Sequence, residues 1–185
     1  MTNRHTTDEM MGMTSEVHRQ RAARISRATM GERLGGFIYG TIVALAVVVA
    51  GARAYPHGAG HIAALVAATS VAFWLAHVYS HALAHSVASD QHLSLAELGH
   101  IAWREGSIIE AAFPPVGALV LGAVGVISTQ TAVWVAFGVC LIVLAAQGMT
   151  VARVEHLGRL GKVAVVAGNV SLGVLLVALK LVVSH

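Results

Sequence analysis

Residues 34–52 read LGGFIYGTIVALAVVVAGA, an uncharged run that lies between Arg33 and Arg53. A helix needs about 20 apolar residues to cross the hydrocarbon of a bilayer, and this run has nearly that length. It is followed by Tyr55-Pro56-His57-Gly58, which is typical of a turn because proline fixes φ and glycine frees it. The stretch therefore predicts a membrane-spanning helix that ends in a tight turn.

Further apolar runs follow along the chain. We expect the remaining spans at about residues 61–88, 107–127, 131–152 and 163–183. The third and fourth are separated at Ser128-Thr129-Gln130. Residues 1–33 then form a basic cytoplasmic tail, partly helical or disordered, and residues 34–185 form the transmembrane domain. The sequence predicts an all-α bundle of five transmembrane helices.

The composition excludes an ordinary water-soluble domain. Hydrophobic residues make up 56% and charged residues 11%, with a mean hydropathy of +0.72, whereas soluble proteins average about 25% charged residues. The net charge of +3 is concentrated in the tail and at span ends, which argues against a nucleic-acid partner. Cys140 is the single cysteine, so neither an internal disulfide nor a cysteine metal site is expected.

The distribution of basic residues predicts the orientation, because cytoplasmic segments of membrane proteins are rich in Lys and Arg. No apolar signal segment precedes Leu34, so the tail is expected to stay in the cytoplasm. With the N-terminus inside, the cytoplasmic side holds Arg4 near the start of the tail and nine basic residues closer to the spans: Arg19, Arg21, Arg24, Arg27, Arg33, Arg104, Arg153, Arg159 and Lys162. Only Arg53 falls in an outer loop, and Lys180 lies near the outer end of the last span. We expect the C-terminus outside.

Two segments are expected to lie on the inner membrane surface. Ser94-Leu95-Ala96-Glu97 fits a capping box, in which the serine and glutamate side chains satisfy free N–H groups at a helix start. Apolar residues then recur at helical spacing, which predicts a short interfacial helix at about residues 94–103. Residues 15–30 are predicted to form a similar basic helix against anionic lipid.

The second span carries the most unusual side chains, in FWLAHVYSHALAH at residues 73–85. His77, His81 and His85 recur every four residues and so share one helix face with Trp74. This spacing suits a metal or haem ligand set, or a path for protons. The alternative is that these histidines lie near the headgroups and anchor the helix. Haem would need a second axial ligand from a loop or another subunit.

Glu110 is the acidic residue placed within a predicted span. Pro114 and Pro115 lack N–H groups, so the carbonyls of Glu110 and Ala111 lose their usual helical partners. Carboxylate and freed carbonyls together predict a polar notch. The alternative is a shallow Glu110 that pairs with Arg104 and caps the helix start.

Counting along each span from the cytoplasmic side predicts a polar belt, with one residue from each helix within about 5–10 Å of the inner boundary. Its members are Tyr39, His81, Glu110, Gln147 and Asn169, with His77 close to His81 and Glu110. We expect the belt to line one cavity open to the cytoplasm. Alternatively, these side chains are hydrogen-bonding contacts between helices, worth about 0.6 kcal/mol each.

Small residues predict where helices approach closely. Gly36, Gly40 and Ala44 form a ridge on the first span, and Ala118 and Gly122 form another on the third. The sequence leaves open whether these ridges pack within one chain or between two subunits.

Three stretches resemble a family of small polytopic membrane proteins of actinobacteria that has no established activity: FWLAHVYSHALAH, IIEAAFPPVGALVLGAVGVIS and GNVSLGVLLVALKLVV. The similarity covers about residues 34–183 and implies a helical fold in a bacterial cytoplasmic membrane. No functional residue can be carried over from it. His77 and Tyr79 fit the pattern of the family, whereas His81 and His85 depart from it, which weakens a mechanism that needs all three histidines.

The sequence thus favours a non-enzymatic, multi-pass protein of the cytoplasmic membrane, acting as a small channel, carrier or proton-handling component. The alternative is an accessory or scaffold subunit of a larger membrane complex. A third reading is a metal- or haem-dependent membrane enzyme that uses His77, His81 and Glu110. Expected partners are lipids and either a second copy of the chain or a larger complex.

Overall fold

The computed structural model describes the backbone of residues 3–89, 94–155 and 157–183. In chain order, its helices are α1 (Asn3–Ala54), α2 (Ala59–Ser89), α3 (Leu95–Arg104), α4 (Ser107–Glu110), α5 (Phe113–Ala123), α6 (Thr129–Val154) and α7 (Arg159–Val183). No strand occurs among these residues, and the predicted all-α class is confirmed.

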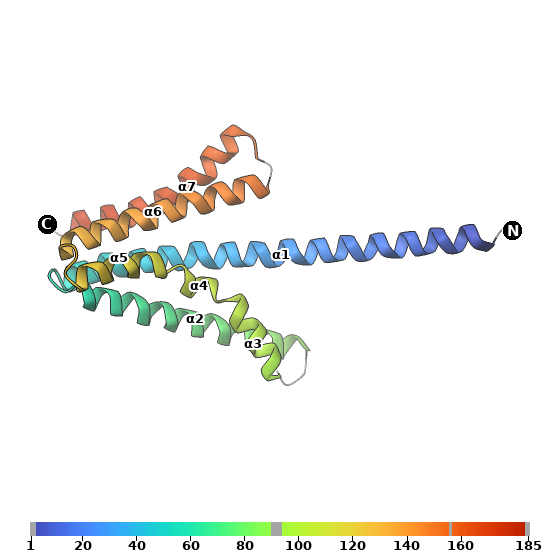
Figure 1. Cartoon of the computed structure of the whole chain (residues 1–185), viewed down its shortest axis with the longest axis horizontal. Helices are drawn as coiled ribbons and strands as arrows, with labels where there is room; N and C mark the ends of the chain where they lie inside the picture. The colour runs from blue at the N-terminus through green and yellow to red at the C-terminus, as the bar shows by residue number, and fades with distance from the viewer. Residues whose placement is uncertain (1–2, 90–93, 156, 184–185) are drawn as a thin grey trace.

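The long helices lie roughly along one direction, so the bundle has two distinct ends (Figure 1). At one end, which we call the closed end, lie the α1–α2 turn (residues 55–58) and the α5–α6 turn (residues 124–128). At the other, the charged end, lie α3, α4 and the α6–α7 connection. The two ends of the described chain lie on opposite sides, with the start of α1 beyond the charged end (Figure 1).

Helix α1 is continuous over 52 residues, a length of about 78 Å at 1.5 Å per residue. It therefore runs well past the other helices, as Figure 1 shows. At the closed end it stops before Pro56, where Gly58 N–H donates to the Tyr55 carbonyl at 3.1 Å. This is the predicted turn, and the rings of Tyr55 and His61 stack across it with centroids 5.2 Å apart.

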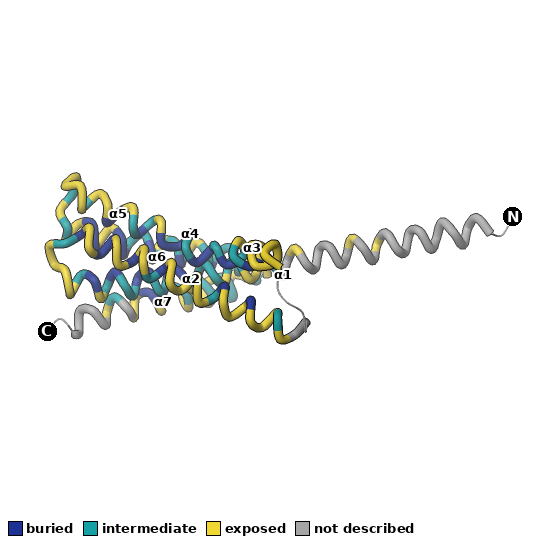
Figure 2. Tube along the Cα trace, turned by 90° about the horizontal axis from the view of Figure 1, so that it is seen from below, coloured by how far each residue is buried: buried dark blue, intermediate teal, exposed yellow. Residues whose placement is uncertain are grey.

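The hydrophobic core lies between α1, α2, α5 and α6, toward the closed end (Figure 2). Its fully buried large side chains include Leu45, Ile62, Leu119 and Phe137. Small residues fill the space between them. Burial of this apolar set against itself fixes the relative positions of the four helices.

Small residues allow the closest helix contacts, and these contacts lie within one chain. A Cβ built on Gly40 would lie 2.7 Å from the Ile108 carbonyl oxygen, and one on Gly122 would lie 2.6 Å from the Ala132 Cβ. A Cβ built on Gly36 would likewise lie 2.6 Å from the Ser107 Oγ. The first ridge therefore packs against α4, and the second packs against α6.

The predicted third span, residues 107–127, is not one straight helix. Helix α4 ends at Glu110, and α5 begins at Phe113 with the two prolines in its first turn. Residues Leu95–Glu110 and Phe113–Ala123 are bent by 50° relative to each other. The break follows from the missing proline N–H groups, which leave the preceding turn without its helical hydrogen bonds. At its other end, α5 ends at Ala123, two residues before Gly125, whose φ of 81° suits glycine.

A helix is present where the interfacial helix is predicted, as α3, and its position on a membrane surface stays a prediction. Ser94 is its N-cap, its hydroxyl accepts from Glu97 N–H at 3.2 Å, and the Glu97 carboxylate accepts from Ser94 N–H at 2.8 Å. The capping box is therefore confirmed. Trp74 Nε1 on α2 donates to the Ala102 carbonyl at 3.0 Å, which fastens α3 to the bundle.

Three described helical segments are long and apolar enough to cross a membrane, namely Thr29–Ala54, Ala59–Val87 and Thr129–Val154. The bent pair that ends at Ala123 makes a fourth if it is one broken span. Only 28–33% of the apolar window in each of the three is buried inside the chain. The outer faces are apolar, as at Ile142 and Tyr79, so the helices are compatible with a membrane protein. The fifth span, at α7, stays a prediction.

Candidate functional site

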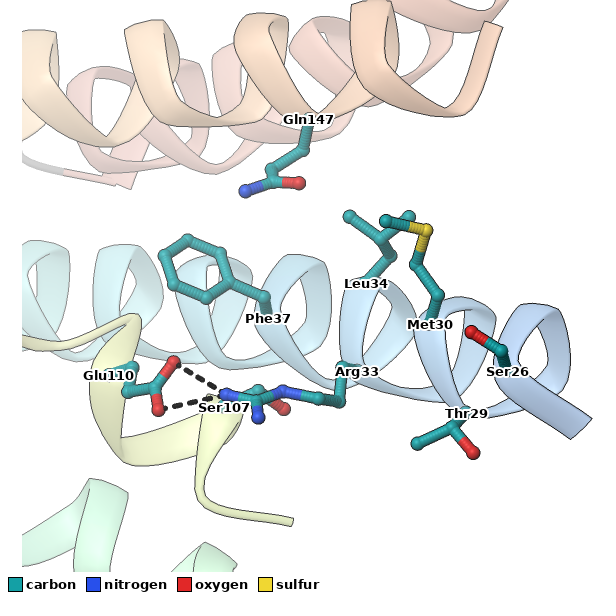
Figure 3. Close-up of a pocket in the computed structure, with 9 residues that line it drawn as sticks. All are labelled: Ser26, Thr29, Met30, Arg33, Leu34, Phe37, Ser107, Glu110 and Gln147. Carbon is teal, nitrogen blue, oxygen red and sulfur yellow. Dashed lines mark hydrogen bonds and ion pairs between the residues drawn. The ribbon is translucent and has the colours of Figure 1, made fainter. Parts of the chain in front are cut away.

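An ion pair joins α1 to α4 at the charged end of the bundle. Arg33 Nη2 donates to both carboxylate oxygens of Glu110, at 3.1 and 3.3 Å (Figure 3). The two side chains are 36% and 46% exposed. The sequence predicts Arg104 or a histidine as the neighbour of Glu110, and the structure pairs Glu110 with Arg33 instead.

The glycine ridge of α1 explains this partner. Because Gly36 and Gly40 have no side chains, α4 lies directly against α1, with Ser107 and Ile108 at the contact. Arg33 lies one turn before Gly36 and so reaches the end of α4. Arg104, in contrast, is occupied elsewhere: its Nη1 lies 3.4 Å from Glu32 Oε2 and its Nε lies 3.9 Å from Glu105 Oε1.

The ion pair lies in the lining of a cavity of about 520 Å³ between α1, α4 and α6, which we call the α1–α6 cavity. Its lining residues are Ser26, Thr29, Met30, Arg33, Leu34, Phe37, Ser107, Glu110 and Gln147. Figure 3 shows that Arg33, Glu110 and Ser107 lie on one side of α1, and that Gln147 reaches toward α1 from α6. The volume lies in the range of small-molecule sites, about 300–1,000 Å³.

Two polar atoms in this lining are buried without a hydrogen-bond partner among the residues that the structure describes: Ser107 Oγ and Gln147 Oε1. A buried polar atom that has lost water and gained no partner costs about 1–3 kcal/mol. The cavity therefore combines a charge pair with a hydroxyl and an amide oxygen whose bonding capacity is unused. Such a lining suits a polar or charged ligand group.

The predicted polar belt is divided by the fold. Glu110 and Gln147 share the α1–α6 cavity, but Tyr39, His81 and Asn169 are not among its lining residues. Asn169 lies at the α6–α7 contact, where its Nδ2 would be 3.1 Å from a Cβ on Gly148 and is buried without a partner within the described chain. Counting along each helix predicts one common depth for these residues. The orientation of each helix about its own axis, however, points their side chains toward different neighbours.

The histidine stripe is divided as well. His77 packs against the Tyr39 ring of α1, with centroids 5.1 Å apart, and its Nδ1 lies 3.0 Å from the Phe73 carbonyl. His81 Nε2 lies 3.6 Å from Glu105 Oε1. The stripe thus contacts α1 at one histidine and the α3–α4 connection at the next.

His81 and His85 on α2 share the lining of a second cavity with a third histidine, on α3. Together with His100, Glu97 and Arg104, they line this cavity of about 560 Å³. No group of three or more His, Cys, Asp or Glu residues in the described segments has the geometry of a metal site. The predicted ligand set of His77, His81 and His85 is therefore not assembled there, because the first of these faces α1.

Sequence reasoning missed Arg33, Ser107 and His100 as site residues. Arg33 was counted only as a charge that bounds the first span, and Ser107 only as the start of the third. One signal was available: Arg33 bounds the first span and Glu110 lies within one helical turn of the predicted start of the third, so two opposite charges lie near the same membrane boundary. Nothing in the local sequence indicates that His100 faces α2.

Comparison of the chain with known protein families, with curated proteins and with solved structures finds no match. The geometry of the charged end therefore carries the functional argument alone.

Proposed function

We propose that this chain is a proton-handling carrier of a bacterial cytoplasmic membrane, with the α1–α6 cavity as its site. The observation that carries the proposal is the half-exposed Arg33–Glu110 pair in a cavity that also holds unpartnered polar atoms. Ionisable groups at membrane depth commonly mark ion and substrate pathways.

The ion pair also supplies a mechanism for coupling. Protonation of Glu110 removes its negative charge, and with it the attraction that holds Arg33 at 3.1 Å. Helix α4 is then released from this contact with α1, and the break at residues 111–112 lets it move relative to α5. A proton taken up on one side of the membrane would thus change the shape of the cavity. A two-state element that is biased by protonation is the minimum a coupled carrier requires.

Proton flux tests this proposal without knowledge of the solute. The purified chain is reconstituted in liposomes that contain a pH-sensitive dye, and a proton gradient is imposed with the membrane potential clamped by valinomycin and K⁺. We expect flux above protein-free liposomes, reduced at least tenfold by Glu110→Gln. Glu155→Gln is the matched control, since Glu155 is exposed at the end of α6 and lies outside the cavity lining.

Wild-type flux equal to that of empty liposomes would contradict the carrier and favour an accessory or scaffold subunit. A specific observation favours that second reading: the backbone of α1 extends far past the charged end, beyond the other described helices (Figure 1). Equal flux in wild type and Glu110→Gln would instead place the pathway outside this cavity.

The proposed topology is five spans with the N-terminus inside and the C-terminus outside. The nine-to-one distribution of basic residues supports it, and α7 returns antiparallel to α6 from the charged end (Figure 1). Reporter fusions after Thr14 and after His185 are expected to report opposite sides of the membrane. A common side for both fusions means an even number of spans and contradicts the proposal.

A further inference from the structure

The Arg33 guanidinium keeps most of its hydrogen-bonding capacity free. Both bonds to Glu110 come from Nη2, and within the described residues no bond from Nη1 or Nε is present. A guanidinium carries five N–H donors in a planar fork that matches phosphate oxygens. Arg33 is therefore able to bind a phosphate group while it keeps its contact with Glu110.

The charge balance of the cavity selects among phosphate ligands. Its lining contains one cation, Arg33, and one anion, Glu110, so its formal charge is zero. A purely anionic group would gain an ion pair with Arg33, but the Glu110 carboxylate would repel it. A ligand with one negative and one positive group satisfies both side chains. The cation must be a primary ammonium to donate hydrogen bonds to the carboxylate, which a trimethylammonium cannot do.

The apolar part of the lining adds a second element of recognition. Met30, Leu34 and Phe37 follow one another along α1 at helical spacing, on the face that Figure 3 shows toward α6. Arg33 immediately precedes the apolar run of residues 34–52, the position at which a spanning helix meets the lipid headgroups. A ligand with its charges at Arg33 and Glu110 would thus place an attached acyl chain along apolar side chains.

We infer that the α1–α6 cavity binds the headgroup of a zwitterionic phospholipid with a primary ammonium, its phosphate at Arg33 and its ammonium at Glu110. The Ser107 hydroxyl lies beside the pair and donates to the phosphate, which gives this buried group a partner. The inference rests on the proposed function in that it uses the same cavity and names the substrate class. The volume of about 520 Å³ accommodates the headgroup and the first carbons of its chains.

Lipid binding is measured on the purified full chain in detergent by native mass spectrometry. The probes are dioleoyl phosphatidylethanolamine, dioleoyl phosphatidylglycerol and dioleoyl phosphatidylcholine, added singly and in pairs. We expect phosphatidylethanolamine to bind at least tenfold more tightly than the other two. Equal binding of the three lipids overturns the inference.

Two variants test the charge assignment. Glu110→Gln leaves Arg33 as the only charge of the lining, so the preference should reverse toward phosphatidylglycerol. Arg33→Gln should weaken the binding of both lipids. Glu155→Gln should retain the wild-type preference. A mere loss of packing would weaken the binding of all three lipids together and would not reverse the order of their affinities. An unchanged preference in Glu110→Gln overturns the inference.

Soluble phosphoethanolamine separates a lipid from a free phosphate ester. We expect no displacement of bound phosphatidylethanolamine by millimolar phosphoethanolamine, because the soluble compound lacks the chain that contacts Leu34 and Phe37. Displacement at concentrations equal to those of the lipid overturns the assignment to a lipid. No proton gradient is used in these measurements, so the two proposals can fail separately. Lipid selectivity without proton flux contradicts the proposed carrier and leaves this inference standing. Proton flux without lipid selectivity overturns this inference and leaves the proposed carrier standing.

Discussion

The closed end and the charged end of the bundle share α1, α2 and α6 but pack in opposite ways. At the closed end, Leu119 and Phe137 are fully or almost fully buried, and the Gly122 backbone lies against Ala132. At the charged end, two cavities of more than 500 Å³ lie between the helices. Ion pairs there join α1 to α4 and α2 to the α3–α4 connection.

The difference follows from side-chain chemistry. Small and branched apolar residues interdigitate to high density, and this fixes one arrangement of the helices. Charged and amide side chains need partners at specific distances, and where the partners are incomplete the space between them stays open. Arg104 Nε, Ser107 Oγ and Gln147 Oε1 all lie at the charged end and lack hydrogen-bond partners in the described part of the chain. The tightly packed core thus lies at the closed end, and the charged end holds the groups on which the proposed function rests.

The largest expected effect is in the core of the closed end. Phe137→Ala removes a side chain that is 2% exposed, and large-to-small changes of this kind cost about 3–5 kcal/mol. We expect a correspondingly large fall in the free energy of unfolding, measured by denaturant titration of the purified protein in detergent. Phe113→Ala, at a residue 65% exposed, is the matched control. Similar losses in both variants would contradict the assignment of the core.

A smaller effect is expected where the backbone approaches most closely. A methyl group at Gly122 would meet the Ala132 Cβ at 2.6 Å and the Ala59 Cβ at 3.1 Å. Because neither neighbour is a flexible side chain, Gly122→Ala should destabilise the bundle by about 1–3 kcal/mol. Gly117→Ala on the same helix adds its methyl to open space and should change the free energy of unfolding little. Equal stability of the two variants would show that the closed end is not tightly packed.

At the charged end, the Arg33–Glu110 pair should contribute little to stability. Its side chains are 36% and 46% exposed, and exposed ion pairs are worth about 0.2–1 kcal/mol. A double-mutant cycle of Arg33→Gln and Glu110→Gln, measured by the same titration, should give a coupling energy in that range. A coupling energy of several kcal/mol would mean that the pair holds the bundle together, and the contrast between the two ends would then fail.

The smallest effect is expected in α3 and is confined to it. Hydrogen bonds from the Ser94 backbone N–H and then from its hydroxyl lower the pKa of Glu97 from 4.5. The folded state therefore favours the ionised carboxylate. The contribution of this carboxylate to the stability of α3 is complete above pH 4.5 and is lost as the pH falls through the lowered pKa. Hydrogen exchange of residues 95–104, corrected for the intrinsic rate, should accelerate in acid relative to α6. Glu97→Gln should remove this pH dependence of exchange. If the variant shows the same pH dependence as the wild type, the capping box is not its cause.

Local sequence determined much of this molecule. The apolar runs of α1, α2 and α6, the turn at Pro56, the cap at Ser94 and the loss of helical hydrogen bonds before Pro114 were all predicted from the residues themselves. Each depends on interactions within about four residues of the chain, so its physical cause is present in the local sequence.

The tertiary structure decided which polar residues meet. Tyr39, Glu110, Gln147 and Asn169 lie at similar depths, but depth does not fix the rotation of a helix about its axis. That rotation is set by the packing of glycines such as Gly40 and of core residues such as Leu119, on other turns and other helices. Arg33 therefore became the partner of Glu110, and Glu105 the partner of His81, through contacts that are distant in the sequence.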